Sequence, residues 1–377
     1  MFARSAPRRE AHSMKWARYE GRDILPMWVA DMDISSPVEI TDALQRRVSM
    51  GHFGYAKPWD GVLEAICDWV AYRHQWTIQP EWIVWLPGVI QGFHAAQKMW
   101  GRPDRATVVQ SPNYPPLRRV TEKYQHAVVH VGSALSGNRW RTDQEQLHHI
   151  LQQEKPSLLH LCNPSNPEGD IWTAKEMLRL ADICAAQGIP VCSDEIHADL
   201  VLDPMPHSPV GAQPGLNEQS ITLMAASKTF NVAGLACAFA IVPNTQIRKT
   251  LHQVLAYETG EVNELGLVAT EAAFRHGRAW HGALLAHLKD QRDQLAQHLE
   301  GTSIRYHPAP ATHLAWLDCR QWAVDPAEHF EAHGLGLSDG KDFGSPGFMR
   351  LNFACGTDLF QEALQRLTQA IAQAPLT

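Results

Sequence analysis

The feature that most constrains the fold is a series of short apolar runs in the middle of the chain, separated by segments with helical character. The runs span residues 82–86, 106–110, 127–131, 158–162, 190–193, 221–225 and 237–242. They are apolar almost throughout, which is typical of strands that are buried on both faces of a sheet. Segments 92–100 and 173–187 between them have helical character, and Gly188 is a stop signal for the second. Thr173 and Glu176 form a predicted capping box at its start. This alternation predicts an α/β fold with a mostly parallel sheet.

Beyond about residue 245 the pattern changes. A long helical stretch over 264–299 comes first, then three strand-like runs and a helical tail, at 303–307, 312–318, 348–353 and 358–374. We expect a smaller α+β domain here, completed by the N-terminal segment, because 377 residues exceed one ordinary core. The predicted division is an N-terminal segment of the small domain (1–45), a large domain (46–265) and a small C-terminal domain (266–377).

Composition excludes several classes of protein. No apolar stretch is long enough to cross a bilayer, and a net charge of −7 without a long basic run argues against nucleic acid as a partner. The first ten residues are basic but lack an apolar core, so we expect no secretory signal. Seven widely spaced cysteines without a C-x-x-C pair fit a reducing cytoplasm. The twenty histidines show no metal-ligand spacing, so no metal site is predicted.

Two charged residues stand at the ends of predicted strands. Lys228 follows the run 221–225, and Asp194 follows the run 190–193. A lysine that forms an imine with an aldehyde cofactor, together with an acid that keeps the cofactor's ring nitrogen protonated, is the chemistry of pyridoxal 5′-phosphate. The alternative is a lysine and an aspartate that only balance each other's charge, and the pair alone does not decide.

A phosphate site is predicted at residues 87–92, Pro-Gly-Val-Ile-Gln-Gly, between a strand and a helix. Free N–H groups at a helix N-terminus bind phosphate, although the same residues could form an ordinary turn. The chain has neither G-x-G-x-x-G nor G-x-x-x-x-G-K-[ST], so nothing indicates a nicotinamide, flavin or P-loop nucleotide site.

Three further residues suit a cofactor and an amino-acid substrate. Tyr114, in the proline-rich loop 111–116, could stack on a ring or could be a surface turn residue. Asn166, in the turn 163–169, could donate to a ring oxygen or could be ordinary turn punctuation. Arg350 lies among apolar residues and could bind a carboxylate through both arms of its guanidinium, or could be an edge-strand arginine.

Taken in order, these pieces resemble the fold-type I enzymes that depend on pyridoxal phosphate, the aspartate aminotransferase superfamily. The resemblance is closer to the class II aminotransferase-like C–S β-lyases, the cystathionine β-lyases of the PatB/MalY type, and runs from about residue 10 to the C-terminus. Trp-Val-Ala-Asp-Met-Asp (28–33) and Ser-Asp-Glu-Ile-His-Ala-Asp-Leu (193–200) are specific to that group, whereas the Ser-Lys and Asn-Pro turns are shared more widely. The other matching segments are 14–16, 25–27, 53–55, 163–169, 227–235 and 350–355.

The resemblance implies roles around the cofactor ring. Lys228 would carry the covalent link to pyridoxal phosphate and then act as acid and base. Asp194 would pair with the ring nitrogen, and His197 would reach the side of the ring oxygen. Asn166 would contact the ring oxygen and the substrate, and Tyr114 would stack on the ring as a further catalytic residue.

The resemblance also implies the phosphate contacts, the substrate contacts and the assembly. The phosphate would be held by Val89, Ile90 and Ser227. Tyr55 would reach the phosphate of the neighbouring subunit in a homodimer. Arg350 would bind the α-carboxylate of an amino-acid substrate, with Asn166 and Ala30 as further substrate contacts.

Two positions depart from the family pattern. Residue 225 is alanine where relatives commonly have a phosphate-binding serine, and the lost hydrogen bond is worth ~1–3 kcal/mol. We therefore expect weaker cofactor binding. His313 stands where relatives often have tyrosine, which leaves the details of the substrate open.

The implied activity is cleavage of cystathionine or a related S-substituted L-cysteine to a thiol, pyruvate and ammonia. The alternative is an aminotransferase, because both reactions begin with the same proton abstraction. A second acid-binding arginine would favour transamination of dicarboxylates, but the sequence does not identify one. A third alternative, a regulatory protein that binds the cofactor without turnover, is disfavoured by the intact Lys228, Asp194 and Arg350.

Overall fold

The computed structural model describes residues 2–6, 12–256 and 258–377. In this part of the chain a seven-stranded sheet has the spatial order β2 (Ile83–Leu86), β10 (Ala238–Ile241), β9 (Ser220–Met224), β8 (Val191–Asp194), β7 (Leu158–Cys162), β3 (Thr107–Gln110) and β4 (Val128–Val131). Strand β10 runs antiparallel to both neighbours, and the other pairs are parallel. The prediction of a mostly parallel sheet is confirmed, and each predicted run forms a strand within one residue of its predicted bounds.

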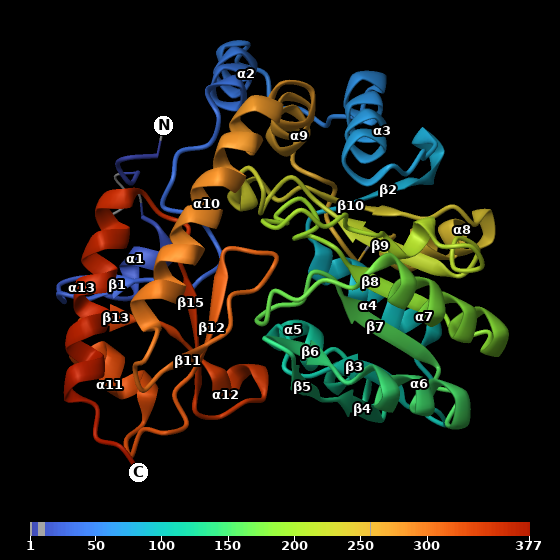
Figure 1. The fold of residues 1–377 in the computed structure, drawn as a ribbon. Helices are drawn as coiled ribbons and strands as arrows, with labels where there is room; N and C mark the ends of the chain where they lie inside the picture. Colours follow the sequence, from blue (N-terminus) through green and yellow to red (C-terminus); the bar gives the residue numbers. More distant parts are fainter. Residues whose placement is uncertain (1, 7–11, 257) are drawn as a thin grey trace.

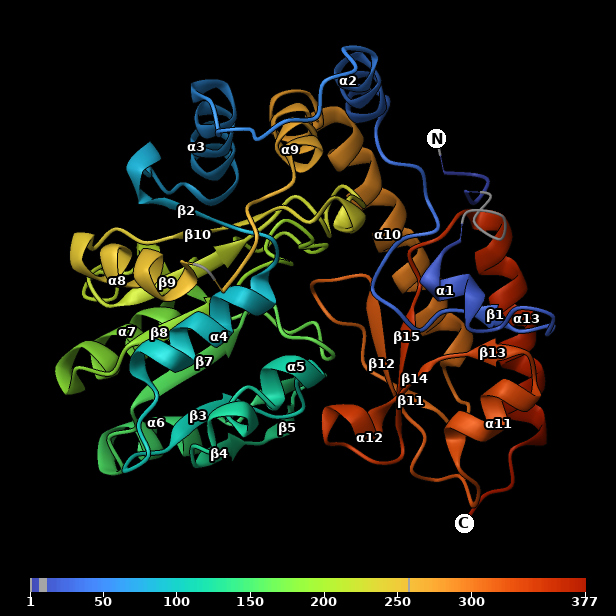
Figure 2. The same ribbon diagram turned by 180° about the vertical axis from the view of Figure 1, so that it is seen from behind.

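Helices cover both faces of this large sheet (Figures 1 and 2). On one face Val109 packs in a core cluster with side chains of α4 (Val89–Trp100) and α8 (Thr245–Leu255). On the other, Val108 packs with side chains of α6 (Gln144–Gln153) and α7 (Ala174–Gln187). Because neighbouring strand residues point to opposite faces, both must be apolar, which explains the continuous apolar runs.

The predicted ends of α7 are confirmed. The side chain of Thr173 accepts a hydrogen bond from the backbone N–H of Glu176, and the Glu176 carboxylate accepts one from the backbone N–H of Thr173. Gly188 follows the helix with a φ of +64°, a conformation that favours glycine.

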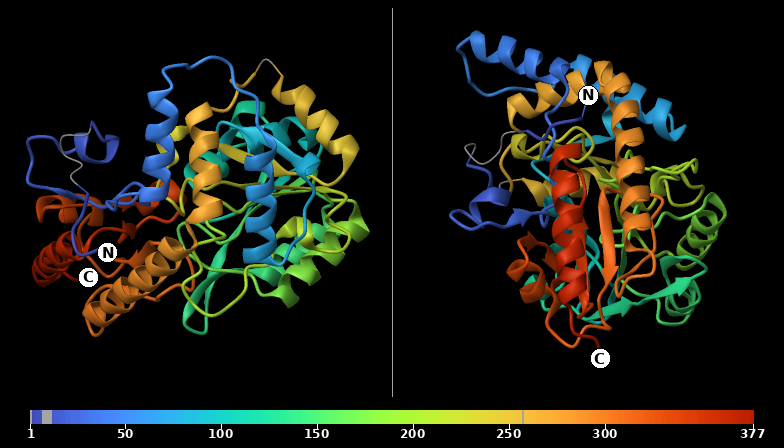
Figure 3. Two further views of the ribbon diagram at one scale, coloured as in Figure 1. Left: turned by 90° about the horizontal axis from the view of Figure 1, so that it is seen from above. Right: turned by 60° about the vertical axis from the view of Figure 1, so that its left-hand side comes forward.

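A second, antiparallel sheet lies in the last quarter of the chain. Within the described residues it has four strands, in the order β11 (Arg305–Tyr306), β12 (Leu314–Asp318), β15 (Phe348–Asn352) and β14 (Ser338–Asp339). The long helices α10 (Arg278–Leu299) and α13 (Thr357–Gln373) lie over it (Figure 3), and α11 (Pro326–Ala332) packs against α13. This part is the smaller α+β region that the sequence predicts.

The helical stretch predicted over 264–299 is two helices rather than one. Helix α9 (Glu264–His276) ends before Gly277, and α10 begins after it. A Cβ atom on residue 277 would lie within 2.5 Å of the Phe230 ring and of the Ala273 carbonyl oxygen. Only glycine therefore fits where the chain passes between the two helices.

The N-terminal segment contacts both parts of the molecule. It contains α1 (Met14–Ala17), β1 (Leu25–Pro26) and α2 (Val38–Ser49). Strand β1 pairs in parallel with β13 (Leu335–Gly336), while α2 packs against α9. Residues 1 and 7–11, which include half of the ten-residue segment predicted not to be a secretory signal, lie outside the described residues. The division at residues 45 and 265 stays a prediction.

The remaining elements are short or lie at the edges. Strands β5 (Ser133–Ser136) and β6 (Arg139–Thr142) form a hairpin that the sequence reading did not predict. The other helices are α3 (Asp60–His74), α5 (Pro115–Arg118), α12 (Gly340–Phe343) and the 3₁₀ turns η1 (Pro80–Trp82), η2 (Glu122–Tyr124), η3 (Val210–Ala212) and η4 (Ala233–Leu235). Among the described residues, no helix combines the length and apolar character that a membrane span requires.

Candidate active site

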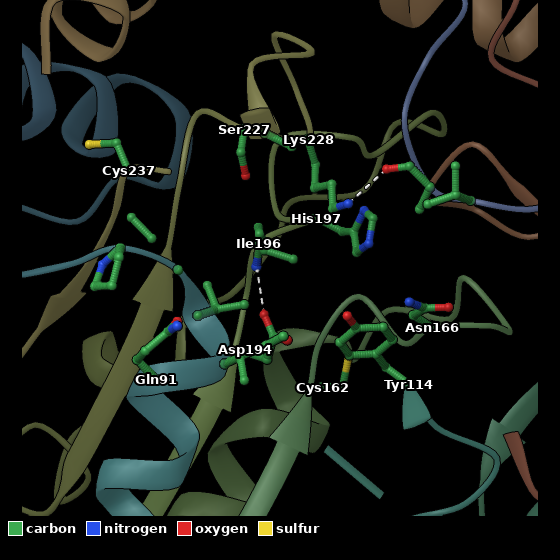
Figure 4. Close-up of a pocket in the computed structure, with 18 of the residues that line it drawn as sticks. Gln91, Tyr114, Cys162, Asn166, Asp194, Ile196, His197, Ser227, Lys228 and Cys237 are labelled. Atoms are coloured by element: carbon green, nitrogen blue, oxygen red, sulfur yellow. Dashed lines mark hydrogen bonds between the residues drawn. The ribbon is translucent and has the colours of Figure 1, made fainter. Parts of the chain in front are cut away.

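A cavity of about 360 Å³ opens where the parallel strands of the large sheet end (Figure 4). Side chains converge on it from the ends of β7 and β8 and from the loop after β9. Ligands of open α/β sheets bind at this edge, because the strand ends and helix N-termini leave backbone groups free there. The cavity is therefore where the predicted site residues should meet.

Lys228 follows β9 by four residues and lies in the cavity wall. Its Nζ donates a hydrogen bond of 2.7 Å to the backbone oxygen of Ala30. Burial and the charge of Arg350 lower the pKa of this amine to about 8, although Asp31 and Asp194 oppose the shift. An amine with this pKa is substantially neutral at mildly alkaline pH, as a nucleophile or a proton acceptor must be.

The loop that carries Ala30 is held by side-chain amides. The amide nitrogen of Asn231, three residues after the lysine, donates to the backbone oxygens of Met32 (2.9 Å) and Ile34 (2.8 Å). The amide nitrogen of Asn352 donates to the backbone oxygens of Val29 (2.7 Å) and Asp31 (2.6 Å). These bonds fix the position of the oxygen that Lys228 contacts.

Asp194 is the last residue of β8, and its side chain reaches the cavity. One carboxylate oxygen accepts a hydrogen bond of 3.2 Å from the backbone N–H of Ile196 (Figure 4). Burial raises the pKa of Asp194 to about 6, and the charge of Lys228 opposes that rise. Within the described residues no cationic side chain forms an ion pair with Asp194, so the carboxylate suits a protonated ligand atom.

Two histidines lie beside the lysine in uncharged form. The ring centroids of His197 and His313 are 5.8 Å apart. Burial lowers the pKa of His197 to about 3 and that of His313 well below its usual value, and the charges of Lys228 and Arg350 add to both shifts. His197 lines the cavity, whereas the family departure His313 lies behind it and is completely buried.

The predicted phosphate end of the cavity is the start of α4. Gly88 precedes this helix without a side-chain cap, its first turn contains no acid, and Val89 and Ile90 line the cavity. A twelve-residue helix presents its free N–H groups and the positive end of its dipole here. Ser227 also lines the cavity, but Ala225, the second family departure, does not.

Arg350, Asn166 and Tyr114 meet at the other end of the cavity. Arg350 lies on β15, between β12 and β14, and is 5% exposed, so the edge-strand alternative is wrong. Its guanidinium donates to the Asn166 amide oxygen and the Trp28 backbone oxygen, both at 2.8 Å. Burial lowers the pKa of Arg350 to about 10. Burial and the charge of Asp194 raise the pKa of the Tyr114 phenol.

Tyr55 is the one predicted site residue that does not reach the cavity of its own chain. The residue is fully exposed, so the alternative of a buried loop tyrosine is wrong. Its contact with a neighbouring subunit stays a prediction.

Several cavity residues were not predicted. They are Val29, Cys162, Ile196, Ala233, Cys237 and Ala238, together with Pro87, Gly88 and Gln91 of the phosphate turn. Gln91 lies inside the predicted phosphate turn and Ile196 inside the Ser-Asp-Glu-Ile-His segment, so the sequence carried a signal for both. Cys162 ends one predicted strand and Cys237 begins another, where a small apolar residue gives no functional signal.

These groups fit pyridoxal phosphate. The cavity offers a buried amine, a buried acid without a cationic partner in the described part of the chain, and an uncapped helix N-terminus. These match the aldehyde, the ring nitrogen and the phosphate of the cofactor. Among the described residues, no cluster of His, Cys, Asp or Glu could hold a metal ion.

Known proteins share this architecture. A family model described as aminotransferase class I and II matches residues 29–371. Cystathionine beta-lyase PatB of Bacillus subtilis is 32% identical over 98% of this chain and 100% of its own length. The crystal structure of OvoB is 38% identical with a TM-score of 0.94, and the match covers 99% of both chains. Cystalysin from Treponema denticola, solved with pyridoxal 5′-phosphate, is 25% identical with a TM-score of 0.93, over 99% of this chain and 98% of its own.

Proposed function

The chain belongs to the class I and II aminotransferase family, and we propose that it is a pyridoxal-phosphate-dependent C–S β-lyase. Its substrate is cystathionine or a related S-substituted L-cysteine, and its products are a thiol, pyruvate and ammonia. The observation that carries this proposal is the likeness to the cystathionine beta-lyase PatB over the full length of both chains. The buried Lys228 and Asp194 in one cavity support it.

Pyridoxal phosphate, when bound, supplies an electron-withdrawing ring next to the substrate's α carbon. Lys228 would hold the cofactor's aldehyde, Asp194 would keep a proton on its ring nitrogen, and the start of α4 with Ser227 would bind its phosphate. Tyr114 and Ile196, which both line the cavity, would pack against the ring.

The remaining residues act on the substrate. Arg350 binds the α-carboxylate, and Asn166, 2.8 Å from its guanidinium, contacts both the ring oxygen and the substrate. Lys228 takes the proton from the α carbon and, once protonated, can return a proton to the departing sulfur. Its lowered pKa of about 8 favours the first step, because less of the amine is already protonated.

We propose that the functional unit is a cytoplasmic homodimer. The segment from α2 to the following loop exposes Val48, Met50, Phe53 and Tyr55, an apolar set that a second copy could cover. Tyr55 would then reach the phosphate in the partner's cavity. Six of the seven cysteines are buried, which supports a reducing compartment.

The test is incubation of the purified protein with L-cystathionine and assay of pyruvate and free thiol. Transamination of the same amino acid with 2-oxoglutarate is measured alongside, because an aminotransferase would use the same residues. We expect equal amounts of pyruvate and thiol without added keto acid, and neither product with the Lys228→Ala protein. Amino transfer that depends on the keto acid, without release of thiol, would show that the protein is an aminotransferase rather than a lyase.

A further inference from the structure

The short helix α5 ends in Arg118, a half-buried arginine without a partner in the part of the chain that the structure describes. Its Nε atom is covered and makes no hydrogen bond, and no described acid lies within ion-pair distance of its guanidinium. A guanidinium nitrogen that is covered without a hydrogen-bond partner is costly. Three other arginines that are partly or fully buried each have a carboxylate partner, in the pairs Arg47–Glu264, Arg141–Glu176 and Arg292–Asp203.

Arg118 lies one helical turn from the cavity wall. Its backbone N–H donates to the backbone oxygen of Tyr114 at 2.9 Å, and Tyr114 lines the cavity. Arg118 lies at the C-terminal end of the four-residue helix that Tyr114 precedes, next to the cavity wall rather than in it. Leu117, which is 1% exposed, fixes the helix in the core.

Gly344, directly after α12, leaves space for the Arg118 guanidinium. A Cβ atom on Gly344 would lie 2.6 Å from Nε and 3.0 Å from Cζ of Arg118, so any larger residue would displace the arginine. Gly344 also has a φ of +93°, which favours glycine. Figures 1 and 2 show the helices concerned, α5 and α12, side by side between the two sheets.

The predicted carboxylate-binding arginine, Arg350, packs against the same turn. The Cζ atom of Arg350 lies 4.7 Å from the ring centroid of Phe343, the residue before Gly344. The backbone oxygen of Phe343 accepts a hydrogen bond of 3.3 Å from the backbone N–H of Asn113. Two guanidinium groups without a carboxylate partner in the described chain therefore contact one turn, Phe343–Gly344, which is tied to the start of α5.

Among the described residues, no anion near Arg118 competes for it. The titratable group that responds to its charge is His130 on β4, whose pKa burial and Arg118 both lower. A histidine is neutral or cationic, so it cannot neutralise the arginine.

We propose that Arg118 binds a carboxylate at the far end of the substrate's sulfur substituent, while Arg350 binds the α-carboxylate. The substrate class is then an S-substituted L-cysteine whose leaving thiol itself carries a carboxylate. This assignment rests on the proposed lyase function and narrows its substrate. A planar guanidinium suits this role because it pairs with a carboxylate through two hydrogen bonds.

The experiment compares two substrates that differ only in charge, S-(3-carboxypropyl)-L-cysteine and its amide, S-(3-carbamoylpropyl)-L-cysteine. We expect the wild-type protein to prefer the acid by about 10- to 100-fold in kcat/KM, the range of a charge-assisted hydrogen bond. In Arg118→Gln protein this ratio should fall to near one, and Arg118→Lys should give an intermediate ratio.

The matched control is Arg119→Gln, a change of the same kind at the exposed neighbouring arginine. It should leave the acid-to-amide ratio at the wild-type value. Circular dichroism and thermal unfolding check that each variant is folded. A wild-type ratio near one, or a ratio unchanged in folded Arg118→Gln protein, would overturn the assignment.

A binding measurement separates this assignment from the lyase proposal. Lys228→Ala protein supplied with pyridoxal phosphate is titrated with both compounds by calorimetry, with and without Arg118→Gln. Tighter binding of the acid that disappears with Arg118→Gln supports the site whatever reaction the enzyme performs. L-Aspartate and L-glutamate are tested for transamination as well, since a second arginine would also serve a dicarboxylate. Their turnover without C–S cleavage would refute the lyase while leaving Arg118 as a carboxylate site.

Discussion

Replacing Glu168 by glutamine should stabilise the protein, and increasingly so as the pH rises from about 5 to about 7.5. Glu168 follows Asn166 in the turn after β7 and is buried. One carboxyl oxygen accepts a hydrogen bond of 3.0 Å from the Ser133 hydroxyl, while the other is buried without a partner in the described residues. Burial raises the pKa of Glu168 from 4.5 to about 8.

The magnitude follows from linkage between proton binding and folding. In the folded protein the carboxyl keeps its proton up to about pH 8, whereas in the unfolded chain it loses the proton above about pH 4.5. Unfolding therefore releases a proton in this window, and the free energy of unfolding falls as the pH rises. Each tenfold change in proton activity is worth about 1.4 kcal/mol, so the loss between pH 5 and pH 7.5 is about 3 kcal/mol. Glutamine has no proton to release and escapes this loss.

The assay is urea unfolding followed by circular dichroism at several pH values, for the wild-type and Glu168→Gln proteins. The exposed Glu154→Gln variant is the control, because it makes the same substitution at a glutamate that is not buried. The difference between Glu168→Gln and wild type should grow by about 3 kcal/mol across the window, whereas the control difference should stay nearly constant. A Glu168→Gln difference that does not depend on pH would refute the reasoning.

Two further predictions concern the site. Asp194→Asn protein should retain pyridoxal phosphate but lose at least about 100-fold in kcat, because a neutral amide cannot hold a proton on the ring nitrogen; a near-normal rate would leave Asp194 a structural role only. Mixing inactive Tyr55→Ala and Lys228→Ala proteins should restore roughly a quarter of wild-type activity after statistical subunit exchange, because each mixed dimer then has one intact site. Proven exchange without recovery would exclude a shared site.

Much of the large sheet could be predicted because its signals are local. Strands buried on both faces need continuous apolar runs. Thr173 and Glu176 indicate the start of α7, and Gly188 indicates its end. The cavity could be anticipated because parallel strands bring Asp194 and the loop of Lys228 to the same edge.

What the sequence did not reveal depends on contacts between distant segments. The break at Gly277 is enforced by Phe230, 47 residues earlier, so the helical pattern alone gives no sign of it. The hairpin of β5 and β6 does have a local signal in the sequence, the two-residue turn Gly137-Asn138, and could have been predicted from it. Arg118 and Arg119 look alike in sequence, and only the packing against Gly344 distinguishes them.

The account rests above all on Lys228 as the residue that carries the cofactor. Reduction of the purified protein with borohydride fixes a lysine-bound pyridoxal phosphate, and proteolysis with mass spectrometry locates it. The phosphopyridoxyl group should be on the peptide containing Lys228 and absent from that peptide in the Lys228→Ala protein. A label on a different lysine, or no label on a protein isolated with the cofactor, would contradict the account.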